Sequence, residues 1–159
     1  NRVLEKAGRT ISDVALGQTF DIDGVHIEVL GVKNPEITRN AINNSSMVMR
    51  VSDAKKSVLF TGDLGAEGGE KLLGSPYANK LPSDYVQMAH HGQNGVREDF
   101  YQKANPTYCL WPTPIWLWNN DNGGGENSGH WRTPEVRGWM AKLPIAKHYL
   151  CWQGLQMIR

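Results

Sequence analysis

The order of the periodic segments constrains the fold of this 159-residue chain more than any other feature of its sequence. The first part is rich in strand patterns: apolar and polar residues alternate from Thr19 to Val32, around the strong turn signal Asp23-Gly24. From Gly62 onwards, short apolar runs alternate with helical segments. This order predicts an α/β domain in which a mixed sheet carries helices on one face.

The individual segments can be placed to within a few residues. After the first hairpin, the predicted strands are 47–51, 58–61, 85–88 and 107–111. The predicted helices are 66–73, 97–104 and 133–143. Residues 112–132 are predicted to be irregular. A hairpin of residues 147–152 and 155–158, turning at Gln153-Gly154, is predicted to close the chain.

Composition excludes some arguments about function. The 17 basic and 16 acidic residues nearly balance, so bulk charge gives no reason to expect binding to nucleic acid or to a membrane. No apolar run approaches the roughly 20 residues that span a bilayer, and the first residues show no signal-peptide pattern. Cys109 and Cys151 are predicted to be small buried hydrophobic residues, with a disulfide between neighbouring strands left open.

Two of the predicted strands end in residues that can bind a metal ion. The strand at 58–61 leads into Gly62-Asp63, and the strand at 85–88 leads into His90-His91. If these strands are neighbours that end at one edge, Asp63 and His91 meet there as an oxygen and a nitrogen ligand suitable for zinc. The alternative is structural, because Gly-Asp after a strand is a common turn. Two ligands do not complete a tetrahedral site, so a working centre needs others.

The order of these motifs resembles that of the ComEC-type metallo-β-lactamase hydrolase domain. In that family an Asn-x-x-Ser strand is followed by a strand ending in Thr-Gly-Asp, and then by one ending in His-His-Gly. The matching segments of this chain are Asn43–Arg50, Val58–Asp63, Asp84–Gly92 and Asn127–His130. The resemblance covers nearly the whole chain, and it implies the C-terminal half of the metallo-β-lactamase αββα sandwich.

The resemblance implies a role for each candidate site residue. Asp63 would bridge two divalent metal ions, zinc or manganese, and His91 would bind one of them. His90 beside it and His130 farther along would be the catalytic candidates, facing the substrate or its leaving group. The implied activity of the complete protein is metal-assisted hydrolysis of a phosphodiester, with DNA as one candidate substrate. Fold similarity cannot choose between phosphoester substrates.

The sequence also departs from the family pattern. The principal metal motif of the family, His-x-His-x-Asp-His, does not occur, and is expected in an N-terminal half that precedes Asn1. A further family histidine is replaced by Asn43 or Asn44, and an amide is a poor zinc ligand. Residues 1–159 are thus expected to form a single domain that is inactive alone. We expect it to form homo-oligomers through the surface that would meet the missing half.

Other interpretations stay open. The chain could be a non-catalytic binding or structural module derived from the hydrolase, with Asp63 and His91 as relics. The aromatic stretch Trp111–Trp131 could form a platform for a base or a cationic group, although packing against the core or the missing half is favoured. His26 and His148, each within a predicted strand, are expected to be structural.

Overall fold

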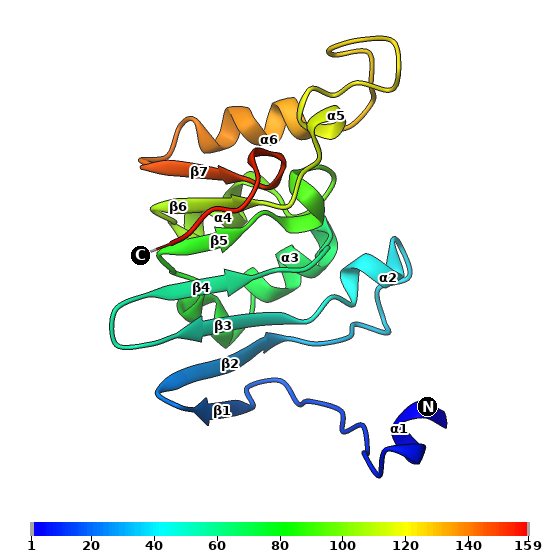
Figure 1. Cartoon of the computed structure of the whole chain (residues 1–159), viewed down its shortest axis with the longest axis vertical. Coiled ribbons are helices and arrows are strands. Elements are labelled where there is room, and N and C mark those ends of the chain that lie inside the picture. Colours follow the sequence, from blue (N-terminus) through cyan, green and yellow to red (C-terminus); the bar gives the residue numbers. More distant parts are fainter. Residues whose placement is uncertain (1, 159) are drawn as a thin grey trace.

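Residues 2–158 are described by the computed structural model, and seven strands in this part of the chain form one sheet (Figure 1). The strands are β1 (Thr19–Ile22), β2 (Val25–Gly31), β3 (Val48–Ser52), β4 (Ser57–Phe60), β5 (Tyr85–Gln87), β6 (Tyr108–Trp111) and β7 (Lys147–Leu150). The α-helices are α1 (Arg2–Lys6), α2 (Ala41–Asn44), α3 (Ala66–Leu73), α4 (Glu98–Ala104), α5 (Ile115–Trp118) and α6 (Thr133–Met140). Short 3-10 helices are η1 (Pro76–Lys80), η2 (Ala89–Gly92) and η3 (Cys151–Gln153).

The strands lie across the sheet in chain order, and the direction of pairing changes once. Strands β1 to β4 pair antiparallel, whereas β4 to β7 pair parallel through crossovers that contain α3, α4 and α6. Leu59 of β4 lies beside Val86 of β5, which lies beside Cys109 of β6. Because parallel strands point the same way, β4, β5 and β6 all end at one edge of the sheet, which we call the carboxyl edge.

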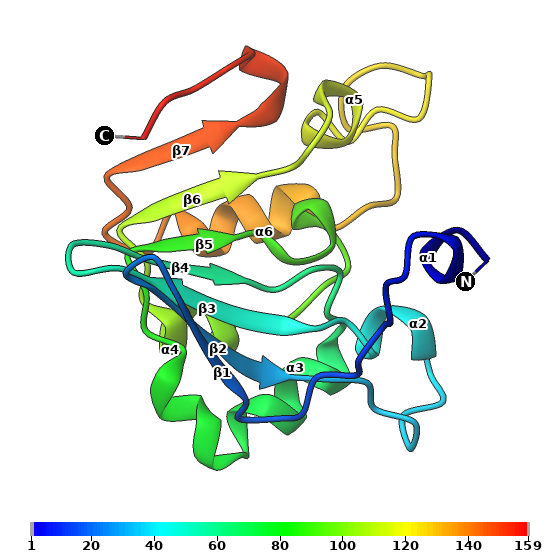
Figure 2. The same ribbon diagram turned by 60° about the horizontal axis from the view of Figure 1, so that its bottom comes forward.

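Helices α3, α4 and α6 cover one face of the sheet (Figure 2). Side chains alternate between the two faces of a strand, so every second strand residue enters the layer under these helices. Leu59, Val86 and Cys109 are fully buried there, packed with Phe100 of α4 and Met140 of α6. Burying a large apolar side chain of this kind contributes about 1.5–3 kcal/mol. None of the helices in residues 2–158 has the length and hydrophobicity that crossing a bilayer requires.

The opposite face of the sheet carries no helix within the described part of the chain (Figure 1). Met49 and Phe60 pair across β3 and β4 on this face, and Phe60 is 38% exposed. Tyr85 and Tyr108 stack on the same face with ring centroids 4.6 Å apart. The C-terminal residues 151–158 cross part of it (Figure 1). One side of the sheet is therefore an apolar, partly uncovered surface, which we call the open face.

The predicted architecture is confirmed: the chain is α/β, with a mixed sheet and helices on one face. Every predicted strand and helix before residue 112 is present to within a residue or two, and α3 has its predicted bounds. Helix α6 begins as predicted at Thr133 but ends at Met140. The stretch 112–132, predicted to be irregular, contains the short helix α5.

Two predictions at the C-terminal end are wrong. The closing hairpin does not form, because β7 ends at Leu150 and the chain turns through η3 instead of extending. Gly154, with φ 84° and ψ −164°, follows η3, and residues 155–158 then pass over the open face without forming a strand (Figure 1). Cys151 lies in this turn, so it is exposed rather than buried, and it is a free thiol. Cys109 is buried as predicted, and burial raises the pKa of its thiol to about 12.

Candidate functional site

The loop after β4 presents Asp63 at the carboxyl edge. Gly62 turns the chain with φ 54°, a conformation that glycine adopts more readily than other residues. The side-chain oxygen of Gln87, in β5, accepts hydrogen bonds from the backbone N–H groups of Thr61 (3.1 Å) and Gly62 (2.9 Å). The hydroxyl oxygen of Ser46 accepts one from the N–H of Asp63 at 3.1 Å. Segments on both sides therefore hold the Asp63 backbone in place.

Helix η2 presents two adjacent histidines at the same edge in an uncommon backbone conformation. His90 and His91 have φ of 49° and 61°, in the left-handed region. This conformation costs an L-residue about 1–2 kcal/mol, and such strain persists only where the surroundings impose it, often at functional sites. Gly92 follows with φ 73°, and a Cβ there would lie 2.4 Å from the ring of Trp111. The close approach of Trp111 therefore requires glycine at this position.

The structure brings Asp63 and His91 together, as the sequence predicted. Nε2 of His91 lies 3.7 Å from Oδ1 of Asp63, and both side chains are partly exposed. Nδ1 of His91 lies 2.8 Å from the carbonyl oxygen of Pro112. A carbonyl only accepts, so Nδ1 must carry the proton in this contact. In the neutral imidazole, Nε2 is then unprotonated and presents its lone pair on the Asp63 side.

This arrangement fits two ligands of a divalent metal ion. A carboxylate oxygen and a neutral imidazole nitrogen are donors that zinc and manganese accept, and a histidine ligand usually donates its other N–H to a carbonyl or carboxylate. Within residues 2–158 there is no cluster of three or more His, Cys, Asp or Glu side chains that could hold a metal ion. The described residues thus offer an incomplete ligand set.

The ring of His90 faces an asparagine. Its ring nitrogens lie 3.3 Å and 3.4 Å from the side-chain nitrogen of Asn43, and Nδ1 lies 3.5 Å from the carbonyl of Asn94. The sequence left open whether Asn43 or Asn44 replaces the family histidine. Asn44 is fully buried and holds α2 against α3, whereas Asn43 borders the candidate site. Asn43 is therefore the asparagine of the pair that can act there.

His130 lies in a cleft of about 390 Å³, which His90 does not line. Asn94, whose carbonyl faces His90, also lines this cleft, so Asn94 lies between the two predicted catalytic histidines and the structure does not bring them into contact. Its other lining side chains include Glu67 and three arginines, Arg39, Arg97 and Arg132. The sequence predicted no functional role for these three arginines. The sequence positions of two of them could have indicated that they meet. Arg97 and Arg132 each directly precede a helix that begins at the carboxyl edge.

The tryptophans of the 111–131 stretch divide between core and surface. Trp111 is 2% exposed, meets Trp118 edge-to-face, and donates from Nε1 to Nδ1 of His148 at 2.9 Å. His148 is thus held by core packing, and burial lowers its pKa. Trp116 is 48% exposed and packs against Trp131 with centroids 5.0 Å apart. Core packing, the favoured interpretation, accounts for Trp111 and Trp118. Trp116 and Trp131 lie at the surface.

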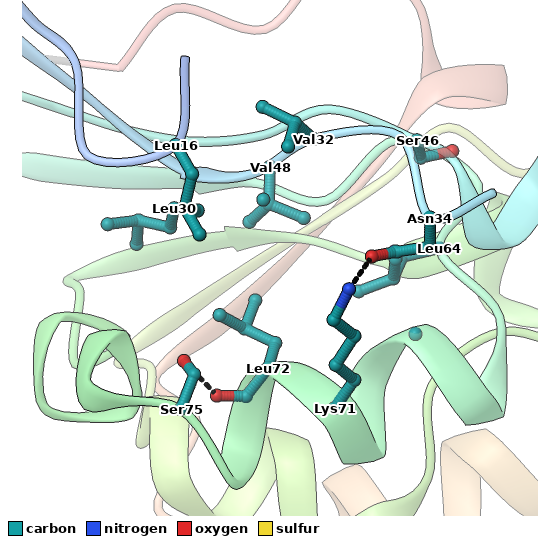
Figure 3. Close-up of a pocket in the computed structure, with 12 residues that line it drawn as sticks. Leu16, Leu30, Val32, Asn34, Ser46, Val48, Leu64, Lys71, Leu72 and Ser75 are labelled. Atoms are coloured by element: carbon teal, nitrogen blue, oxygen red, sulfur yellow. Dashed lines mark hydrogen bonds between the residues drawn. The ribbon is translucent and has the colours of Figure 1, made fainter. Parts of the chain in front are cut away.

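A second cavity lies away from the histidines, between the edge of the sheet and α3 (Figure 3). It measures about 60 Å³, and Leu16, Leu30 and Val48 form much of its wall. Nζ of Lys71 is directed to the side-chain oxygen of Asn34 at 2.6 Å rather than into the apolar space (Figure 3). Small size and apolar walls make this a packing gap rather than a substrate site.

In sequence, the chain is similar to several bacterial proteins. It is 30% identical over 113 residues to ComE operon protein 3 of Bacillus subtilis, across 69% of this chain and 14% of that protein. It is 34% identical over 95 residues to competence protein ComA of Neisseria gonorrhoeae, across 58% and 13%. In sequence, this chain is similar to competence proteins. The expected resemblance is confirmed, and the chain spans about a seventh of the length of these relatives.

Further matches are more distant. The chain is 29% identical over 101 residues to recombination protein 2 of Haemophilus influenzae, across 63% of this chain and 12% of that protein. No protein-family model matches this chain.

Two solved structures of the metallo-β-lactamase kind also match the chain. YhfI from Bacillus subtilis, a metallo-β-lactamase fold protein, matches with a TM-score of 0.47 and 10% identity, over 86% of this chain and 49% of that one. A metallo-β-lactamase superfamily protein from Thermotoga maritima matches with a TM-score of 0.40 and 15% identity, over 69% and 51%. At these identities the likeness concerns the fold alone.

Proposed function

We propose that this competence-related chain supplies part of a divalent-metal centre, and that the complete protein hydrolyses phosphodiester bonds. The observation that carries the proposal is the facing pair of Asp63 Oδ1 and His91 Nε2, 3.7 Å apart, with Nδ1 of His91 held by the carbonyl of Pro112. An imidazole fixed in this way presents its free nitrogen to a metal ion. The names of the relatives, which refer to competence and recombination, favour DNA as the substrate.

Each site residue has a distinct part in this proposal. Asp63 and His91 would hold a zinc or manganese ion, which supplies Lewis acidity for hydrolysis when bound. His90 precedes His91 in the chain and, with Asn43, would orient the substrate through its partly exposed ring. His130 would contact the substrate from across the cleft. The remaining ligands of this ion, and those of a second ion, would come from residues outside this chain. The chain alone would therefore be inactive.

A second candidate function is a binding module without catalysis. Two points favour it: Asn43, which borders the candidate site, lies in the region where the resemblance implies a family histidine, and the described residues hold no cluster of three metal ligands. In that case Asp63 and His91 would be retained for structure. The left-handed backbone of His90 and His91 argues for the hydrolase, because strained conformations of this kind gather at functional sites.

The test is phosphodiesterase activity of the longest protein that contains this segment, assayed on a labelled oligonucleotide with zinc or manganese. We expect Asp63→Asn and His91→Gln each to lower kcat/KM by about 100-fold, because each removes a ligand. His26→Gln is the matched control, since it removes the imidazole of a different His–Asp pair, 2.8 Å apart in the β1–β2 hairpin. No activity of the wild-type protein would favour the binding module, and activity that the first two variants leave unchanged would show that Asp63 and His91 are not its metal ligands.

A further inference from the structure

The cleft that contains His130 gathers positive charge from separate parts of the chain. Arg39 comes from the loop before α2, Arg97 directly precedes α4, and Arg132 directly precedes α6. Helix α3 contributes Ala66 and Glu67 of its first turn. These residues meet because α3, α4 and α6 each follow a parallel strand, so all three helices begin at the carboxyl edge.

Helix dipoles add to the charge of the arginines. Helices α3 and α6 have eight residues each, and the positive ends of both lie at the cleft. A helix N-terminus carries about half a positive charge and favours a nearby anion by about 0.3–1 kcal/mol. The lining side chains comprise three arginines and one glutamate. Glu70 and Glu135 pair with Arg97 and Arg132 beside this lining, so the cleft concentrates guanidinium donors rather than net charge.

Carboxylates also touch each arginine, but they leave donors free. Nε of Arg39 lies 3.5 Å from Glu67, and Nε of Arg97 lies 3.1 Å from Glu70. Exposed pairs of this kind are worth about 0–1 kcal/mol, so a phosphate can compete with them.

The terminal Nη groups supply the donors. Those of Arg39 and Arg97 have no hydrogen-bond partner among residues 2–158. Arg132 uses Nε and one Nη on Glu135, at 2.6 Å and 2.7 Å, and retains its other Nη. A guanidinium has five N–H donors, which suit the oxygens of a phosphate.

We propose that this arginine cleft binds successive phosphates of a nucleic-acid strand and delivers the strand to the Asp63–His91 pair. The cleft involves the same loops as the pair: Asn94 lines it with its carbonyl near His90, and Ala66 lines it three positions after Asp63. Its volume of about 390 Å³ exceeds that of a single phosphate group. The identity of the strand as a substrate rests on the proposed function, whereas binding by the arginines does not depend on a metal.

The test is binding of a fluorescein-labelled single-stranded oligonucleotide to the chain in EDTA, followed by fluorescence anisotropy at several salt concentrations. We expect Arg97→Gln to weaken binding about 10-fold and to reduce the slope of log K against log salt by about 0.7, the loss of one phosphate contact. Lys103→Gln is the matched control, since it removes the same charge from the exposed, opposite end of α4. We expect it to change binding less than 2-fold, and both variants to retain the wild-type unfolding midpoint.

The outcomes separate this inference from the proposed function. Binding in EDTA that Arg97→Gln weakens, and Asp63→Asn leaves intact, supports the cleft even if no metal site exists. Equal effects of Arg97→Gln and Lys103→Gln would overturn it, as would no measurable binding by the wild-type chain. Competition by inorganic triphosphate at concentrations similar to the oligonucleotide would also overturn it, because the ligand would then be a compact polyphosphate rather than a strand.

Discussion

At the scale of single residues, the candidate site depends on backbone conformations that few side chains tolerate. His90, His91 and Gly92 lie consecutively in the left-handed region, where Trp111 leaves no room for a Cβ on Gly92. The Thr113 hydroxyl donates to the carbonyl of His91 at 2.6 Å and helps to fix this turn. The position of the His91 ring is therefore a product of packing behind it, not only of its own contacts.

Gly92→Ala tests this dependence. We expect it to lower the free energy of unfolding by about 3 kcal/mol, from the left-handed backbone together with overlap against the buried Trp111 ring. Gly24→Ala is the control, because Gly24, in the β1–β2 turn, has a similar φ of 81° but no atom within 4 Å of the place that an added methyl group would take, so only about 1 kcal/mol is expected. Urea unfolding measures both, and equal losses would mean that Trp111 does not constrain the turn.

The sequence was informative about some residues and silent about others. Asp63 and His91 could be paired in advance, because neighbouring parallel strands end at the same edge and each residue lies in the loop that follows its strand. The contact of His91 with Pro112 and the grouping of Arg39 with Arg97 and Arg132 could not be predicted. Those contacts join loops whose paths depend on tertiary packing rather than on local periodicity.

At the scale of secondary-structure elements, one buried asparagine connects the loop region to the helix layer. The side-chain nitrogen of Asn44 donates to the carbonyl of Arg39 (2.9 Å) and to Glu67 (3.0 Å), and its oxygen accepts from the N–H of Gly68 (2.8 Å). The bond from Asn44 also lowers the pKa of the Glu67 carboxyl. Asn44 thus sets where α2 lies relative to the start of α3, next to the arginine cleft.

Replacing the two neighbouring asparagines should separate structure from function. We expect Asn44→Ala to lower the free energy of unfolding by about 2–3 kcal/mol, because it leaves the buried N–H of Gly68 without an acceptor. Asn43→Ala removes only long contacts to His90 and should cost less than about 1 kcal/mol. Thermal unfolding compares the two variants, and a larger loss for Asn43→Ala would contradict the assignment of Asn44 as the structural residue.

Element prediction succeeded where periodicity was strong and failed at the C-terminus. The apolar residues of 155–158 look like a strand, yet Leu155 is 96% exposed and the chain leaves the sheet after η3. Among the described residues, β7 is the last strand of the sheet and pairs only with β6. The alternating pattern of residues 155–158 therefore gave a wrong prediction of a strand. A glycine turn can direct a short apolar segment over a face of the sheet instead of along its edge.

At the scale of the whole molecule, the helices cover one side of the sheet and leave the open face partly uncovered (Figures 1 and 2). Met49 and Phe60 lie there together, and exposed apolar surface of this kind favours association. The expected homo-oligomer would form through this face when no other part of a longer protein covers it.

Phe60→Glu tests that expectation by sedimentation analysis. We expect the wild-type chain to self-associate and the variant to associate about 10-fold more weakly, because a charge replaces a buried phenyl ring in the interface. Ile42→Glu is the control, since Ile42 is an isolated exposed apolar residue of α2, 88% exposed and away from the sheet. Association weakened equally by both changes would mean that the open face is not the interface.

The central claim of this account is that Asp63 and His91 are metal ligands, and metal content after equilibrium dialysis against zinc tests it most directly. Inductively coupled plasma mass spectrometry would compare the wild-type chain with Asp63→Asn, His91→Gln and the control His26→Gln. We predict bound zinc in the wild type and in His26→Gln, below one ion per chain because the ligand set is incomplete, and its loss in the other two variants. The same zinc content in all four proteins would contradict the claim.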